Sequence, residues 1–147
     1  HGFLKLGLYS ESGWQDVVET KKFINKKYFK NSSEDIRIYR QDIINENKNS
    51  SLQTMKFTPD FYSTSSVRDL LFHTQVHLFT IPQISKILKN LNLQFLGFIN
   101  SDITLKTKFL RSFPEDKNNT SLDNWHQFEI NNPKIFAKMY QFWIKKK

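Results

Sequence analysis

Hydrophobic and polar positions along the chain predict an alternation of short strands and amphipathic helices. Residues 3–9 carry Phe, Leu and Tyr in a short, partly alternating run, which predicts a buried strand. From residue 14 to about residue 29, apolar side chains recur at the spacing of one helical face, with charged side chains between them. A second helical pattern follows a cap at residues 31–33 and fades in an Asn- and Ser-rich loop at residues 45–51.

The clearest predicted unit is a helix joined by a tight turn to a strand. Thr80 fits the N-cap of the helix, Pro82 fits its first turn, and Gln83 is placed to complete a capping box. Apolar side chains then follow one helical face. Asn92 is a residue type that adopts the left-handed conformation that ends a helix, and residues 93–99 have the composition of a second strand.

The segments around this unit give weaker patterns. Hydroxyl residues at 63–66 predict a cap for a short helix over residues 67–72, and residues 105–113 predict another helix that ends before Pro114. A helical stripe begins at residue 122. The end of the chain allows two interpretations, because apolar residues from Phe136 to Trp143 fit helical spacing, whereas residues 140–144 also fit a closing strand.

Length and composition favour one folded domain over residues 1–147. Hydrophobic residues make up 38% of the chain and include 14 Phe, which is too many for a disordered segment. The longest apolar runs are far shorter than the ~20 residues of a membrane-spanning helix, so we expect no membrane segment. The absence of Cys excludes disulfides, thiolate zinc sites and Cys nucleophiles, and it fits a cytoplasmic location.

A net charge of +8 raises the question of a nucleic-acid partner. Of the 22 basic residues, 18 are Lys, and they accompany many Asn, Ile and Phe, as expected for a gene rich in A and T. Arg, which makes bidentate contacts with phosphate and guanine, occurs only four times. The sequence therefore does not indicate nucleic-acid binding.

Several candidate site residues lie close together near the middle of the sequence, at residues 68–77. His73 and His77 are four residues apart, the spacing of a metal pair on one helical face, but no third ligand accompanies them and we predict no metal site. One interpretation places an acceptor pocket around five side chains: Arg68, Asp69, His73, Gln75 and His77. In the other, the Arg and Asp pair within a helical turn and the His residues cap or pack.

Two further groups have both a functional and a structural interpretation. Tyr9 and Ser10 end the first predicted strand, at the edge where doubly wound sheets place their ligands, so they are candidates for substrate binding as well as ordinary core and turn residues. An aromatic set in the last third of the chain fits stacking on a planar substrate, but its helical spacing favours the core. The set comprises Trp125, Phe128, Phe136, Tyr140, Phe142 and Trp143.

Three blocks resemble a bacterial family of class I S-adenosylmethionine-dependent methyltransferases, often attached to tetratricopeptide repeats. The first block is residues 2–11, similar to the strand that follows a proline-glycine-glycine turn in that family. The second and most specific block is residues 68–84, continued by residues 93–98. The third combines residues 125–129 with Asn132, Pro133, Phe136 and residues 139–143.

The resemblance implies an α/β chain, or α+β as a fragment, forming the C-terminal portion of a Rossmann-like methyltransferase sheet with flanking helices. The first strand would be the fifth strand of a seven-stranded doubly wound sheet. The chain would form one side of the methyl-acceptor site. The S-adenosylmethionine-binding N-terminal half would be absent, so the chain would be inactive alone and would need that upstream half as a partner. The competing interpretation is a noncatalytic interaction module that uses the aromatic surface to dimerise or to hold a partner. An exposed edge of the first strand, at residues 4–8, would favour such association, including pairing with a second copy of the chain.

Two positions depart from the resemblance, and one expected motif is missing. His1 stands where a proline or glycine of the turn is expected, and Val76 stands where a glutamate is expected. The four Gly residues, at positions 2, 7, 13 and 97, are too far apart to build the glycine-rich loop that holds a nucleotide in this fold. We therefore expect no S-adenosylmethionine bound to this chain.

Overall fold

The computed structural model describes residues 2–45, 52–73, 75–99, 103–137 and 139–147. The chain forms two compact units. The sheet-containing unit combines residues His1–Trp14 with His77–Lys147, and the helical unit is Gln15–Val76. The expectation of a single domain over residues 1–147 stays a prediction.

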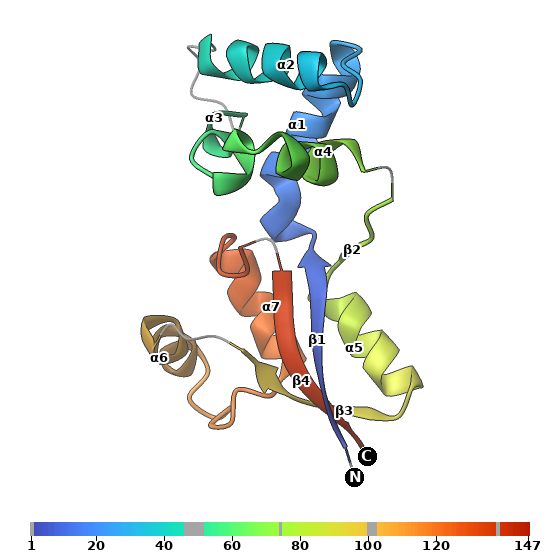
Figure 1. Ribbon diagram of the computed structural model, residues 1–147. Helices are drawn as coiled ribbons and strands as arrows, with labels where there is room; N and C mark the ends of the chain where they lie inside the picture. Colours follow the sequence, from blue (N-terminus) through green and yellow to red (C-terminus); the bar gives the residue numbers. More distant parts are fainter. Residues whose placement is uncertain (1, 46–51, 74, 100–102, 138) are drawn as a thin grey trace. The chain divides into compact units, whose positions relative to one another are not determined.

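A mixed four-stranded sheet organises the sheet-containing unit. Its strands are β1 (Phe3–Ser10), β2 (Leu78–Phe79), β3 (Leu93–Phe98) and β4 (Met139–Lys146), in the order β2-β1-β4-β3 (Figure 1). β4 lies antiparallel to both β1 and β3, whereas β2 is parallel to β1. Among the described residues, β2 pairs with β1 only at Tyr9 and Ser10, so most of this edge of β1 lacks a strand partner.

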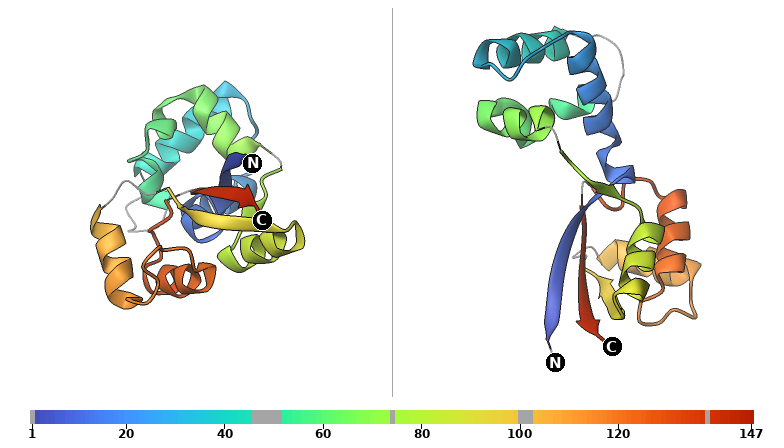
Figure 2. Two further views of the ribbon diagram at one scale, coloured as in Figure 1. Left: turned by 90° about the horizontal axis from the view of Figure 1, so that it is seen from below. Right: turned by 90° about the vertical axis from the view of Figure 1, so that its right-hand side faces the viewer.

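Three helices cover one face of this sheet: α5 (Ile81–Asn90), α6 (Ile103–Ser112) and α7 (Leu122–Asn131). The right-hand view of Figure 2 shows them on the same side of β1 and β4. Their apolar faces meet the alternate residues of β4 that point inward, and burial of this large aromatic core drives the packing. The core residues are Ile81, Ile84, Leu88, Phe95, Leu105, Phe109, Trp125, Phe128, Phe136, Tyr140, Phe142 and Ile144.

The other face of the sheet remains open in this unit. Side chains alternate along a strand, so β1 and β4 place Phe3, Lys5, Tyr9 and Trp143 on that face. Phe3 is 68% exposed and Trp143 is 43% exposed. The expectation that residues 3–9 form a strand is confirmed, but the expectation that this strand is buried is wrong, because only one of its faces meets a helix layer.

The predicted unit of a helix, a tight turn and a strand is confirmed at α5 and β3. Thr80 and Gln83 form the predicted capping box at the start of α5, and Asn92 has a φ of 52° between α5 and β3. At the end of the chain the strand interpretation is confirmed and the helical one is wrong, because Tyr140 and Phe142 are buried while Gln141 between them is exposed. The two-residue β2 was not predicted.

The described residues of the helical unit form five helical elements. They are α1 (Gln15–Lys26), α2 (Ser33–Asn45), α3 (Leu52–Met55), η2 (Pro59–Tyr62) and α4 (Thr64–Phe72), and the 3-10 turn η1 (Ser12–Trp14) of the other unit precedes α1. The predicted helices before residue 45 and after residue 63 are confirmed, and Ser63 caps α4 by accepting a hydrogen bond from the Ser66 amide. Tyr39 and Phe61 meet edge to face in the core, with ring centroids 6.1 Å apart. Residues 46–51, most of the predicted Asn- and Ser-rich loop, lie outside the described residues.

Candidate functional site

A buried carboxylate lies at the carboxyl end of β1. Glu129, on α7, is 6% exposed and is the one acidic or basic side chain classed as buried among the described residues. Ser10, the last residue of β1, is fully buried beside it. Transfer of a carboxylate out of water is costly unless it is hydrogen-bonded or paired with a cation. The surroundings of Glu129 therefore determine what this site can do.

Three hydroxyl groups converge on the same oxygen of Glu129. Its Oε1 atom accepts hydrogen bonds from Ser12 Oγ at 2.5 Å, from Tyr140 Oη at 2.7 Å and from Ser10 Oγ at 3.5 Å. Ser10 Oγ lies 3.0 Å from Ser12 Oγ and also accepts a hydrogen bond from the Gly13 amide. This hydroxyl cluster joins the end of β1, the η1 turn, α7 and β4.

The three hydroxyl groups satisfy one oxygen of Glu129 but bring no positive charge to it. None of the three bonds goes to Oε2, and within the described residues no Lys, Arg or His nitrogen lies within ion-pair distance of the carboxylate. Burial, followed by the hydrogen bond to Glu129, raises the pKa of the Tyr140 phenol above its usual range. Tyr140 is therefore a hydrogen-bond donor to Glu129 at neutral pH.

Strand and helix periodicity explain why these residues meet. Ser121 caps α7 by accepting a hydrogen bond from the Asn124 amide, and the helix then buries Trp125, Phe128 and Glu129 on one face. Alternation along β4 turns Tyr140 toward that same face. Glu129 thus occupies a core position because of its place on the apolar stripe of α7.

The two candidates at the end of β1, Ser10 and Tyr9, point to opposite faces of the sheet. Ser10 points into the hydroxyl cluster, whereas Tyr9 lies on the open face of the sheet, where its ring centroid is 4.4 Å from that of Trp14. The structure thus places Ser10 next to an ionisable side chain and Tyr9 against an aromatic one.

The five candidates around residues 68–77 have other partners. Arg68 donates from Nε to the Asn31 carbonyl oxygen at 2.9 Å and from Nη2 to Ser33 Oγ at 3.2 Å, which ties α4 to the start of α2. The His73 carbonyl oxygen accepts a hydrogen bond from Lys21 Nζ, and Asp69, Gln75 and His77 are exposed. No hydrogen bond among the described residues joins any two of the five side chains. Their role in an acceptor pocket stays a prediction.

His73 and His77 do not have the helical spacing that the sequence analysis considered for a metal pair. α4 ends at Phe72, and His73 is its C-cap with an extended backbone, so His73 and His77 do not share a helical face. The structure shows no group of three or more potential metal ligands among the residues it describes. No helix in the described part of the chain is long and apolar enough to cross a membrane.

The described glycines do not form a nucleotide cradle. Gly7 lies inside β1 and Gly97 lies at the bulge of β3. Gly13 follows β1 in a turn that leads into a helix, but it is a single glycine and its amide is already bonded to Ser10. The residues described here therefore do not fit S-adenosylmethionine, the cofactor that the sequence resemblance implies.

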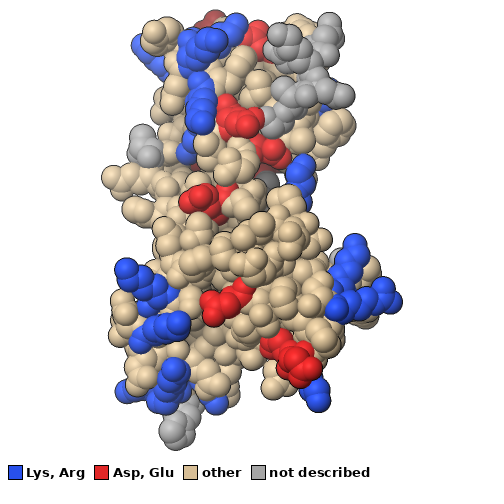
Figure 3. All heavy atoms as spheres, turned by 180° about the vertical axis from the view of Figure 1, so that it is seen from behind, with Lys and Arg blue, Asp and Glu red and all other residues tan. Residues whose placement is uncertain are grey.

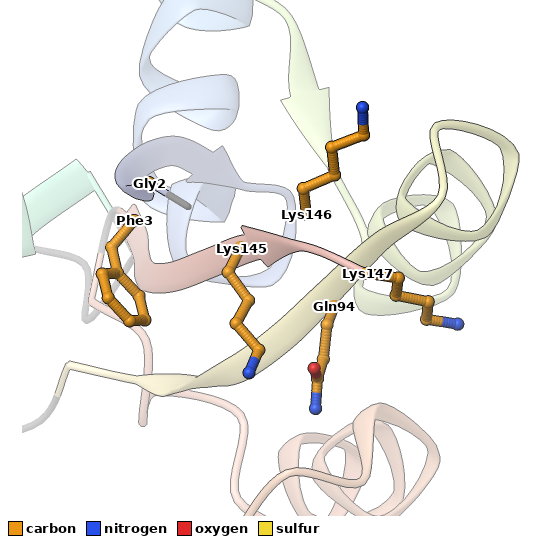
Figure 4. Close-up of a pocket in the computed structure, with 6 residues that line it drawn as sticks. All are labelled: Gly2, Phe3, Gln94, Lys145, Lys146 and Lys147. Atoms are coloured by element: carbon orange, nitrogen blue, oxygen red, sulfur yellow. The ribbon is translucent and has the colours of Figure 1, made fainter.

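A shallow hollow lies at the opposite end of β1. Its volume is about 330 Å³, and Figure 4 shows Phe3, Gln94 and Lys145 pointing to one side of the sheet while Lys146 points to the other. The remaining lining residues are Gly2 and Lys147, so no acidic side chain lines it.

On the face shown in Figure 3, acidic side chains lie among the Lys and Arg side chains of the described residues, so the positive charge is spread out.

Most of the aromatic set is core. Five of its six members are buried, and Phe109 and Trp125 stack with ring centroids 3.9 Å apart, whereas Trp143 lies on the open face. Sequence reasoning missed Glu129 as a site residue. The available signal was an acidic residue next to Phe128 and four positions after Trp125, on the apolar stripe of a predicted helix.

Comparison with known proteins identifies a fold relative. No family model and no curated protein matches the sequence. The structure is similar to part of PKMT2, a protein lysine methyltransferase from Rickettsia typhi, with a TM-score of 0.64 and 12% sequence identity. The similarity covers 99% of this chain and 29% of that one, so the chain spans less than a third of its length. The α/β class is confirmed, and the chain has the fold of a methyltransferase-like segment.

Proposed function

We propose that this chain is the acceptor-side part of an S-adenosylmethionine-dependent methyltransferase. Its whole length corresponds to less than a third of a methyltransferase structure, which supports a role as one portion of a larger catalytic fold. In open α/β sheets, ligands bind beyond the carboxyl ends of the parallel strands. The observation that carries the proposal is the hydroxyl cluster around Glu129, which lies at that end of β1.

The cofactor would be held by other residues. Because the described residues contain no nucleotide cradle, this chain would contribute walls, hydroxyl groups and a carboxylate to the acceptor side. S-adenosylmethionine would supply the methyl group when bound to the partner half. Alone, the chain would be inactive.

The partner half would dock on the edge and open face of the sheet. β1 pairs with β2 at only two positions, and the exposed Phe3 and Trp143 side chains lie on a face that doubly wound sheets cover with helices. Strand pairing along β1 and helix packing over Trp143 would satisfy both surfaces.

Two measurements test this proposal. Isothermal titration calorimetry of the isolated chain with S-adenosylmethionine should detect no binding, and micromolar binding would overturn the assignment. Reading the gene upstream of His1 supplies the second test, because an in-frame strand followed by a glycine-rich turn and a helix is expected there. The polypeptide that includes this region should transfer tritiated methyl groups to protein, and an upstream region without such a turn would contradict the proposal.

The free edge of β1 also supports a second function, that of a noncatalytic module that pairs with its own copy. Antiparallel pairing of two β1 edges would extend the sheet and bury Leu4, which is exposed in the single chain. Sedimentation velocity distinguishes the two functions. A concentration-dependent dimer that Leu4→Lys abolishes favours the module, and a monomer at all concentrations argues against it.

A further inference from the structure

We propose that Glu129, Ser12 and Tyr140 form a binding site for the alkylammonium group of the methyl acceptor. The chemical class of the group, a primary amine in its protonated form, follows from charge and hydrogen-bonding capacity at the hydroxyl cluster. That this amine is the methyl acceptor rests on the function proposed above.

The charge of the cluster is the first argument. Glu129 is the one buried acidic or basic side chain in the described part of the chain, yet its neighbours are hydroxyl groups. The chain carries 22 Lys and Arg residues against 14 Asp and Glu, so cations are abundant in the sequence but none pairs with this carboxylate among the described residues. A buried anion is stabilised most by a cation at hydrogen-bond distance, which leaves the place of that cation to a ligand.

The hydrogen-bonding capacity of the cluster is the second argument. Glu129 Oε2 receives none of the three hydroxyl bonds, and a carboxylate oxygen has two lone pairs. Ser12 and Tyr140 each direct their single hydrogen at Oε1. Ser10 Oγ lies 3.0 Å from Ser12 Oγ, and a hydrogen bond from Ser10 takes up one of the two lone pairs of the Ser12 oxygen and leaves the second as an acceptor. Three acceptors of this kind match the three N–H donors of an alkylammonium group, which has no acceptor of its own.

The position of the cluster fits entry of a slender chain. Ser12 is only half-buried and belongs to η1, the turn that follows the carboxyl end of β1. A compact ammonium on an aliphatic stem suits such a site better than a broad planar guanidinium. Ser10 is fully buried behind the cluster, where its hydroxyl oxygen lies 3.0 Å from that of Ser12.

Titration of the isolated chain with n-butylammonium chloride tests the proposal, with 1-butanol as an uncharged probe of the same stem. Two-dimensional NMR should show saturable shifts of the Gly13 amide and of signals around Glu129 with butylammonium but not with butanol. Glu129→Gln preserves the size of the side chain and removes its charge. It should weaken binding by about tenfold or more, because hydrogen bonds to charged groups are the strong ones.

Glu115→Gln is the matched control, since Glu115 is exposed in the loop before α7 and loses the same charge. It should bind butylammonium as the unaltered chain does. If Glu129→Gln fails to fold, Tyr140→Phe and Ser12→Ala each remove one of the proposed acceptors and should each weaken binding.

Three results would overturn the site: no saturable shift with butylammonium, equal shifts with butanol, or loss of binding in Glu115→Gln equal to that in Glu129→Gln. This outcome is separate from that of the proposed function. Glu129-dependent butylammonium binding without methyl transfer by the longer polypeptide would refute the methyltransferase and keep the cation site. Methyl transfer without butylammonium binding would do the reverse.

Discussion

Tyr140 donates its phenolic hydrogen to Glu129 Oε1 over 2.7 Å, and this bond links β4 to α7 across the core of the sheet-containing unit. The two residues are eleven positions apart, on either side of a turn that contains Pro133. Both side chains are buried, so the hydrogen bond between them replaces hydrogen bonds that each would make to water in the unfolded chain.

Replacing Tyr140 with Phe should lower the free energy of unfolding by about 1–2 kcal/mol, because a buried carboxylate loses one of its donors while the ring keeps its packing. Urea denaturation followed by circular dichroism measures the change. Tyr62→Phe is the control, since that side chain is 72% exposed and its loss of a hydroxyl should leave stability nearly unaltered. Equal effects of the two substitutions would contradict a special role for the bond.

Stability should fall at alkaline pH through two phenols. Burial raises the pKa values of Tyr39 and Tyr140 above the usual range. The folded chain therefore holds these protons more tightly than the unfolded chain does. The contribution to stability is complete below the ordinary tyrosine pKa of about 10 and is lost as the pH rises from there through the raised values.

Ultraviolet absorbance of tyrosinate against pH measures this effect. The late-titrating component should shrink in Tyr140→Phe and again in Tyr39→Phe. A titration in which all five tyrosines ionise together below the unfolding pH would contradict the prediction.

Gly97→Ala should destabilise the chain by about 1–3 kcal/mol, because Gly97 has a φ of +133°, a conformation that residues with a Cβ rarely adopt. The space around Gly97 is open, so the effect is one of backbone strain and not of a clash. Gly7→Ala is the contrasting variant: its Cβ would approach Met139 Sδ to 2.9 Å, but that is the end of a flexible side chain that can move aside. Thermal denaturation should rank Gly97→Ala as clearly the less stable of the two.

Phe109→Ala should cost about 3–5 kcal/mol, because Phe109 is fully buried and stacks on Trp125 with an angle of 22° between the ring planes. Phe57→Ala, at a side chain that is 79% exposed, should have little effect. Urea denaturation followed by tryptophan fluorescence measures both. A loss for Phe109→Ala no larger than that for Phe57→Ala would show that the aromatic core contributes less than its burial implies.

Local signals account for what the sequence predicted well. The capping box at Thr80 and Gln83 and the left-handed Asn92 are interactions between residues a few positions apart, so their outcome depends little on the rest of the fold. The end of β4 was ambiguous for the opposite reason. The apolar residues from Phe136 to Trp143 satisfy two periodicities, and pairing with β1 and β3 selects the strand.

The candidate site was only partly predictable. Ser10 was identified from its place at the end of a predicted strand, and it does lie beside the buried carboxylate. The helical spacing considered for His73 and His77 does not occur, because α4 ends before both residues, at a C-cap that no nearby glycine marks. β2 is too short to have a periodicity, and only its pairing with Tyr9 and Ser10 makes it a strand.

By itself, the sequence determined nearly all of the helices, the first strand and the aromatic content of the core, because these depend on spacing and on contacts within a few residues. The α/β class was implied by the resemblance of three sequence blocks to a methyltransferase family and not by spacing. Only the tertiary structure decided that one face of β1 stays exposed and that Glu129 is buried among three hydroxyl groups. Ser10 and Ser12 each lie more than a hundred positions from Glu129 along the chain, and nothing in local periodicity encodes which distant side chains will enclose a charge. That choice is made by the packing of α7 against the sheet.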